Sequence, residues 1–237
     1  MRASTVEKPK ASGFGDAAPR DLLWALAPAE RERVVEVGRR RPLPRHSIIY
    51  SQGDPPGMTY ILERGMVRTF RISRDGHQFT IGFWRENDII GGPDVFSTAP
   101  RWLSAETVTD CELLGFTDRD LDLLIAELPR FAHNMIAALS FKSRWVMNTG
   151  DALGTASVEQ RVAHVILLQA EVHGRAADDG VCELTHMSHR DIATLVGASR
   201  QWVTQTLSAL EGRGLIRTGH RRITVLDPER LEELARL

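Results

Sequence analysis

The chain has 237 residues, of which 42% are hydrophobic and 26% are charged, the composition of a folded globular protein with room for one or two domains. Its net charge of −1 argues against binding to nucleic acid through overall charge alone. No apolar run reaches the ~18 residues of a membrane span and no signal-peptide core is present, so we expect a cytoplasmic protein without a membrane partner. Cys111 and Cys182 are too few for a disulfide framework or an iron–sulfur cluster, and we expect no metal site.

The N-terminal part of the chain divides into an arm and a helix. Residues 1–20 are rich in Ala, Lys, Pro, Ser and Gly without an apolar period, which predicts a disordered arm. Residues 21–37 carry apolar side chains at helical spacing and predict the first helix of a domain over residues 21–129.

Short β-rich runs separated by turn residues fill residues 42–117. Gly and Asn suit these turns because they tolerate positive φ, as Gly65 and Asp75-Gly76 illustrate. Many short strands with regular turn signals predict an antiparallel barrel or jelly roll, here called the β-roll. The expected strands are 46–50, 58–62, 66–72, 78–83, 89–90, 106–109 and 111–117.

A short helix over 121–128 and a long helix over 130–153 should follow the β-roll. The long helix carries a stripe of apolar or small residues whose steps alternate between four and three, the period of a coiled-coil seam. This stripe consists of Ala132, Ile136, Leu139, Ser143, Val146, Gly150 and Leu153.

A second apolar set on the same helix should point about a quarter turn away from the stripe and pack on the β-roll. Its members are Phe131, Met135, Ala138 and Trp145. One helix with two apolar faces needs two partners, so we expect a homodimer joined along residues 130–153. Burial of the helix within one monomer is the alternative that periodicity leaves open.

The segment after the long helix predicts a hinge and two more helical signals. Gly154-Thr155-Ala156 is the expected hinge, and Ser157 with Gln160 predicts a capping box that opens a helix to about His173. Ser188 and Asp191 predict a further helix start, Gly197 its end, and Ser199 the start of the next helix.

The pair of helices over 188–213 has the mechanical requirements of a helix-turn-helix. Ala193 is small enough for two helices to cross, Gly197 suits the tight turn, and Val203 is a β-branched anchor beneath the second helix. An ordinary helical hairpin is the alternative. We expect the inward face of the second helix to consist of Trp202, Val203, Leu207 and Leu210.

A hairpin around Gly219-His220, within residues 215–226, completes a winged helix-turn-helix over residues 154–237. Between His186 and Arg222 six arginines face only two acidic residues, as expected for a DNA-binding module. Arg pairs with guanine and Gln with adenine, and residues at a helix N-terminus reach base edges in the major groove. The expected base-reading residues are Arg200, Gln201, Thr204 and Gln205. The expected phosphate contacts are Ser188, Ser199, Arg221 and Arg222.

The order of these parts resembles the cyclic-AMP receptor / fumarate-nitrate regulator family of bacterial transcription factors. The resemblance covers about residues 22–234 and is most specific over 195–205 and 210–216. It implies an α+β fold with an N-terminal effector-sensing β-roll, a dimerisation helix and a C-terminal winged helix-turn-helix. It also implies a homodimer on two-fold symmetric double-stranded DNA and contact with RNA polymerase, for which residues 173–181 resemble the placement of an activating loop.

Cyclic-AMP-binding relatives hold the nucleotide with a ribose-binding Glu, a phosphate-binding Arg and a neighbouring hydroxyl. The matching stretch begins at Gly91, where Arg101 occupies the position of the Arg but Gly92 replaces the Glu and Trp102 replaces the hydroxyl residue. On the long helix, Val146 and Met147 fall where relatives use Thr and Ser. Each lost contact costs ~1–3 kcal/mol, so we expect that this pocket does not bind cyclic AMP in the usual way. Arg101 is equally readable as a surface or salt-bridged residue.

The identity of the effector is therefore an open question at the level of the sequence. Aromatic residues near the matching stretch could line a pocket for an apolar or planar ligand, although each one singly is better read as core. These residues are Phe83, Trp84, Phe96, Trp102 and Trp145. Haem through His77 or His133, cyclic di-GMP, or no ligand at all remain alternatives, so no cofactor is assigned.

Two other classes of function compete with a DNA-binding regulator. The first is a cyclic-nucleotide-gated module whose C-terminal part contacts protein. The second is an enzyme, which we do not expect because the sequence shows no nucleophile–base–acid set and no phosphate-binding Gly loop joined to a catalytic residue.

Overall fold

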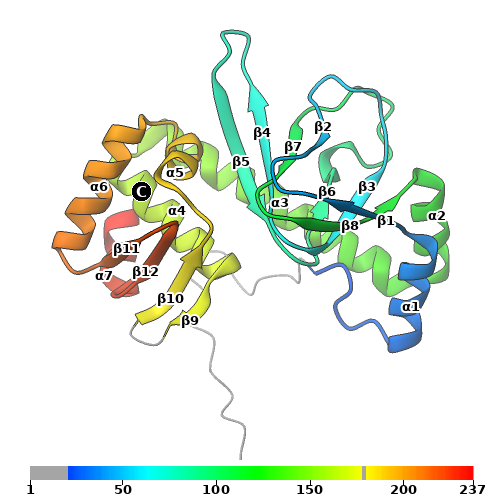
Figure 1. The fold of residues 1–237 in the computed structure, drawn as a ribbon. Helices are drawn as coiled ribbons and strands as arrows, with labels where there is room; N and C mark the ends of the chain where they lie inside the picture. The colour runs from blue at the N-terminus through cyan, green and yellow to red at the C-terminus, as the bar shows by residue number, and fades with distance from the viewer. Residues whose placement is uncertain (1–20, 178–179, 237) are drawn as a thin grey trace, which may run out of the picture.

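The computed structural model describes residues 21–177 and 180–236, so the expected arm over residues 1–20 lies outside the described residues. A β-roll and a winged helix-turn-helix stand side by side, and the long helix α3 (Pro129–Thr155) connects them (Figure 1). The expected α+β architecture is confirmed. Among the described residues no helix is both long and apolar enough to cross a membrane.

Two four-stranded antiparallel sheets form the β-roll. One has the strand order β1-β8-β3-β6 and the other β2-β7-β4-β5. The strands are β1 (Arg39–Leu43), β2 (Ile48–Tyr50), β3 (Thr59–Arg64), β4 (Val67–Ile72), β5 (Gln78–Trp84), β6 (Ile89–Ile90), β7 (Ser104–Thr107) and β8 (Cys111–Phe116). A 3-10 turn, η1 (Gly92–Asp94), follows β6.

The sequence prediction missed strand β1 and placed the first helix too early. β1 contains three arginines and Pro42, which masked it, but it lies at a sheet edge where a proline is tolerated. Helix α1 (Pro28–Val37) begins at a proline that suits the first helical position, while residues 22–25 form turns. Helix α2 (Asp118–Glu127) begins three residues earlier than expected because Thr117 and Asp120 form its capping box.

Helix α3 runs to Thr155, so Gly154 and Thr155 lie inside the helix, and only Ala156 of the expected hinge lies outside it. The chain turns at Ala156 and Ser157, and α4 (Val158–His173) follows at once. The capping box at the start of α4 is confirmed, since the Ser157 N–H donates to Gln160 Oε1 at 2.9 Å and the Gln160 N–H donates to Ser157 Oγ at 3.2 Å.

The two expected faces of α3 differ in their burial. The expected second set is buried against the β-roll, as predicted. Ile136, Val146 and Met147 leave 66%, 48% and 58% of their surfaces exposed, and Ser143 and Gly150 are exposed too. Leu139 and Leu153, two members of the predicted stripe, are half-buried instead. Burial within one monomer therefore accounts for only one of the two faces.

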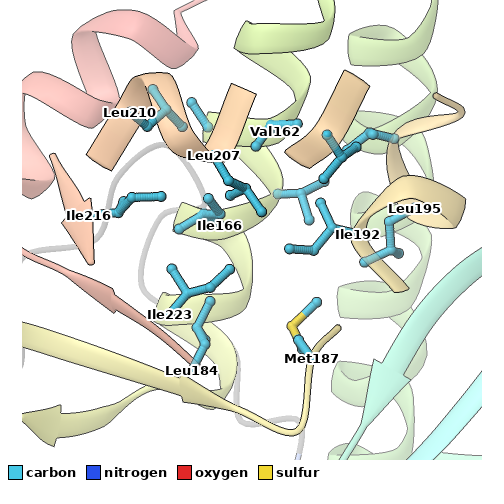
Figure 2. Packing of buried hydrophobic residues seen from close by; sticks show 14 of the residues in the cluster. Val162, Ile166, Leu184, Met187, Ile192, Leu195, Leu207, Leu210, Ile216 and Ile223 are labelled. Carbon is cyan, nitrogen blue, oxygen red and sulfur yellow. The ribbon is translucent and has the colours of Figure 1, made fainter. Parts of the chain in front are cut away.

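The winged helix-turn-helix has a core to which its four helices and three of its strands contribute, among them the residues labelled in Figure 2. Its elements are α4, β9 (Arg175–Ala177), β10 (Gly180–Thr185), α5 (His189–Val196), α6 (Arg200–Gly212), β11 (Ile216–Gly219), β12 (Arg222–Val225) and α7 (Pro228–Ala235). The sheet order is β11-β12-β10-β9. Helix α7 was not predicted, although Asp227 before Pro228 is a helix-start signal that caps it.

This core does not end at the boundary of the winged helix-turn-helix. Met66, Phe83 and Val108 of the β-roll belong to the same buried cluster. Thr80 in β5 and Thr194 in α5 share a hydrogen bond of 2.7 Å between their hydroxyl groups. The two parts of the chain are thus packed directly on each other.

Trp145 of α3 occupies the centre of the β-roll's contact with the long helix. It is 1% exposed, and its indole Nε1–H donates to the Ile81 carbonyl at 2.8 Å. Its ring lies 5.8 Å from that of Trp84 and 6.1 Å from that of Phe141. Leu168 of α4 joins the same buried cluster.

Replacing Trp145→Ala should lower the free energy of unfolding by about 3–5 kcal/mol, because it removes a fully buried ring and leaves a cavity. Urea unfolding followed by circular dichroism measures this loss. Trp102→Ala is the control, since Trp102 is 56% exposed and should change stability by less than about 1 kcal/mol. Equal effects of the two substitutions would contradict the assigned role of Trp145.

Candidate nucleic-acid interface and effector region

Helices α5 and α6 begin and end at the residues that the sequence predicted. Ser188 and Asp191 form a capping box, and Ser188 Oγ donates to Asp191 Oδ2 at 2.6 Å. Gly197 has φ +60°, the left-handed conformation that favours glycine at the end of a helix. Ser199 Oγ accepts the N–H of Trp202 at 3.2 Å and so caps α6. These contacts place the N-terminus of α6 at the surface.

The outward side of α6 is polar. Arg200, Gln201, Thr204 and Gln205 are all exposed, and no acidic residue occurs between Arg200 and Ser208. Helix α6 lies on the outer side of the winged helix-turn-helix, away from the β-roll (Figure 1). The four expected base-reading residues therefore share one accessible helix.

Thr204 differs from the other three because its hydroxyl already has partners. Thr204 Oγ1 donates to the Arg200 carbonyl at 2.9 Å and lies 3.0 Å from Nδ1 of His189, the first residue of α5. Since this hydroxyl donates to the carbonyl, it accepts from the imidazole N–H. The contact ties the middle of α6 to the start of α5.

The predicted inward face of α6 is wrong at one position. Val203, Leu207 and Leu210 are buried, as expected, but Trp202 is 61% exposed. Thr206, 8% exposed, completes the buried face in its place. A helix advances about 100° per residue, so Trp202 falls at the edge of the buried face, on the side opposite Thr204.

The wing turns one residue later than predicted. Gly219 pairs with Arg222, so His220 and Arg221 form the turn, and Arg221 adopts φ +53°. Arg221 Nη2 donates to the His186 carbonyl at 3.2 Å and lies 3.7 Å from Asp191 Oδ2. Arg222 Nε lies 3.1 Å from Glu183 Oε1. Both arginines expected to contact phosphate therefore have partners within the chain.

Glu211 at the end of α6 anchors the wing. Its carboxylate accepts the N–H and the hydroxyl of Thr218 in β11, each at 2.7 Å. These hydrogen bonds stabilise the charged form and lower the pKa of Glu211 below its ordinary value. The wing is thereby fixed relative to α6.

Arg101 is buried in the β-roll instead of lying at its surface. Only 3% of its side chain is exposed, and its Nη2 donates to the Met58 carbonyl at 2.6 Å. Its Nη1 lies 3.5 Å from Asp94 Oδ2, and its guanidinium lies 4.5 Å from the centre of the Tyr50 ring. Burial raises the pKa of the Tyr50 hydroxyl. Gly91, with φ +92°, passes so close that a Cβ there would lie 3.2 Å from Arg101 Nη1.

The neighbouring positions of the expected effector pocket do not converge on Arg101. A Cβ on Gly92 would lie 2.9 Å from Leu139 Cδ2 of α3, so a side chain at residue 92 would require the end of the Leu139 side chain to shift. Trp102 is exposed, and Arg71 stacks on its ring at 4.2 Å. Val146 and Met147 are exposed on α3 within one chain.

Some of the other candidate ligand residues are buried in the core, and the rest are exposed. Phe83, Trp84 and Trp145 are buried and belong to the core, whereas Phe96 is 45% exposed. His77 and His133 are exposed. In the part of the chain that the structure describes, no group of three or more His, Cys, Asp or Glu side chains is arranged to hold a metal ion.

Comparison with known proteins agrees with this geometry. Residues 40–127 match the cyclic nucleotide-binding domain family, and residues 160–234 match the Crp-like helix-turn-helix domain family. The cyclic AMP receptor protein of Thermus thermophilus is 31% identical over 214 residues, covering 90% of this chain and 96% of that protein. The CRP-like cAMP-activated global transcriptional regulator of Mycobacterium tuberculosis is 31% identical over 195 residues, covering 81% and 86%.

Solved structures share the fold. FixK2 from Bradyrhizobium japonicum superposes with a TM-score of 0.73 at 23% identity, covering 84% of this chain and 98% of that one. The c-di-GMP-responsive regulator CLP of Xanthomonas campestris superposes with a TM-score of 0.71 at 22% identity, with the same coverage. With a cyclic nucleotide-binding β-roll, a Crp-like helix-turn-helix and relatives aligned along nearly their whole length, the chain belongs to the CRP/FNR family of DNA-binding transcription regulators.

Proposed function

We propose that this regulator binds a two-fold symmetric operator as a homodimer, with α6 of each subunit in a major groove. The exposed, polar and acid-free outward side of α6 carries this proposal. Arg200, Gln201 and Gln205 would read base edges through their amide and guanidinium groups. Thr204 would contribute less to direct reading, because its hydroxyl is held by Arg200 and His189.

The phosphate contacts follow from the two helix starts and the wing. Ser188 and Ser199 cap α5 and α6, so backbone N–H groups beside them can hold phosphate oxygens. Arg221 and Arg222 would exchange their partners, Asp191 and Glu183, for DNA phosphates. In the proposed arrangement, residues 21–129 sense an effector, residues 130–153 form the dimer contact, and residues 154–237 bind DNA.

The exposed side of α3 supports the homodimer. It presents Ile136, Val146 and Met147 beside Ser143 and Gly150, a combination of apolar area and small residues that lets two helices approach closely. A water-exposed apolar stripe of this kind is unfavourable on a monomer. A second copy of α3 has the matching stripe.

The effector region supports a sensor that does not use cyclic AMP in the usual way. The buried Asp94 already supplies negative charge beside Arg101. The end of the Leu139 side chain lies next to Gly92, and Val146 and Met147 are exposed on α3. An altered pocket for another anionic ligand, cyclic di-GMP included, is the second candidate. It is favoured by Arg101 Nη1, which is buried and lies 3.5 Å from Asp94 Oδ2 but makes no hydrogen bond among the described residues.

RNA polymerase is the further partner that a transcription regulator needs. Residues 173–181 precede α5 and include strand β9, but residues 178–179 lie outside the described part. The assignment of this segment as an activating loop is a proposal from its placement alone.

Arg200→Ala should lose about 1–3 kcal/mol of discrimination at one base pair in each half-site, because a bidentate Arg–guanine contact is removed. The operator is first selected from random DNA by the wild-type chain, and binding is then measured on single-base variants. Exposed Arg230 on α7 offers a control, since Arg230→Ala should leave the preferences unchanged. Unchanged selectivity of Arg200→Ala would remove Arg200 from the base-reading residues, and a wild type that selects no sequence would refute DNA reading by α6.

Gly150→Arg should convert the dimer into a monomer and weaken operator binding. Within one chain nothing lies within 4 Å of a Cβ at this position, so the monomer accommodates the side chain. Between two closely packed helices it does not. Sedimentation equilibrium measures the change, with Gly150→Ala as the matched control that should remain dimeric and gain up to ~1 kcal/mol of helix stability. A dimeric Gly150→Arg variant would contradict the proposed interface.

Cyclic AMP should show no saturable binding below about 1 mM, because the three missing contacts of ~1–3 kcal/mol each weaken the complex by several orders of magnitude. Isothermal titration of the full chain with cyclic AMP, cyclic GMP and cyclic di-GMP tests this. Micromolar binding of cyclic AMP would overturn the proposal of a degenerate pocket, whereas saturable binding of cyclic di-GMP alone would support the second candidate.

A further inference from the structure

Trp202, the third residue of α6, is 61% exposed, more than any of the other four tryptophans. It is absent from the buried cluster that the rest of α6 helps to form. The indole has a large apolar area, and leaving it in water forgoes the stabilisation that burial would provide. The position of Trp202 on α6 indicates which partner covers the indole.

Trp202 borders the side of α6 that would face DNA. At 3.6 residues per turn its surface neighbours are Gln205, one turn onward, and Ala209. Both of these residues are exposed, while Val203, the next residue after Trp202, is buried. The helix surface thus has Gln201 and Gln205 at its centre, Arg200 and Thr204 on one flank, and Trp202 on the other.

We propose that Trp202 is a DNA-positioning residue that packs its indole against the deoxyribose wall of the major groove and donates its Nε1–H to a phosphate oxygen. This contact rests on the proposed entry of α6 into the groove. A bulky, rigid side chain on the flank of the helix meets the sugar–phosphate wall, whereas the central residues and the long, flexible Arg200 on the other flank can reach base edges. The indole suits that wall because it combines an apolar body with a polar N–H edge.

The salt dependence of DNA binding distinguishes the Trp202 contact from the phosphate contacts of the wing arginines. Trp202 carries no charge, so its loss releases no phosphate counterion and leaves the salt dependence of binding unchanged. Arg222→Ala, in contrast, should flatten that dependence. Because the contact is with the backbone, the loss of Trp202 should weaken binding to all sequences alike.

The test compares full-length wild type, Trp202→Ala and Trp202→Phe by fluorescence anisotropy on the selected operator and on an unrelated duplex across a range of salt. Trp202→Ala should bind both DNAs about tenfold more weakly with an unchanged salt slope. Trp202→Phe should lose about threefold, because the ring remains and the N–H is lost. Trp24→Ala is the matched control, since Trp24 is 48% exposed in the turns before α1, and this variant should bind as the wild type does.

A spectroscopic readout shows the contact directly. Wild type and Trp202→Phe are both labelled with 5-fluorotryptophan, and their fluorine NMR spectra are compared. The resonance that is present in the wild type and absent from Trp202→Phe belongs to Trp202. That resonance should shift on addition of the operator, while those of the buried Trp84 and Trp145 stay in place.

Three results would overturn the contact. They are wild-type affinity in Trp202→Ala, a loss confined to one base pair, and a Trp202 resonance that operator DNA leaves unchanged. A loss confined to an A·T pair would assign the ring to a thymine methyl group instead. A wild type that binds no DNA would overturn the proposed function itself, which is visible before any variant is made.

Discussion

Trp145 packs where the β-roll, the long helix and α4 meet. Its ring is enclosed by Trp84 and Phe141, its N–H is satisfied by the Ile81 carbonyl, and Leu168 brings α4 into the same cluster. A buried indole whose polar atom is paired has few alternative placements, so it sets the rotation of α3 about its own axis. That rotation decides which side of the helix is left for a second subunit.

A second contact extends this constraint to the DNA-binding part. Phe83 of β5 enters the core of the winged helix-turn-helix, and Thr80 hydrogen-bonds Thr194 in α5. Since α5 packs on both β5 and α6, the orientation of α6 is linked to strand β5 by direct packing. A change in the β-roll at β5 would therefore move α5 or break these contacts, which gives a sensor a physical route to the DNA-binding surface.

The effector region shows how a family site can be retained in outline while its chemistry changes. Arg101 keeps its place in the chain but is neutralised by Asp94 and held by the Met58 carbonyl. Leu139 of α3 lies against Gly92, so the packing of the long helix and the residue at position 92 are adjacent in the structure.

Local chemistry in the sequence was enough to predict the helix-turn-helix and most elements of the fold, although not β1 or α7. Ser188, Gly197 and Ser199 act through hydrogen bonds and φ angles within a few residues of themselves, so their roles can be read without the tertiary structure. Only the tertiary structure decided which residues at the margin of a face are buried. Periodicity alone put Trp202 inside, because a stripe drawn from 100° steps cannot say how wide the core contact is. Arg101 was ambiguous for a related reason: its burial depends on Asp94 and Met58, which meet it only once the strands of the β-roll have paired.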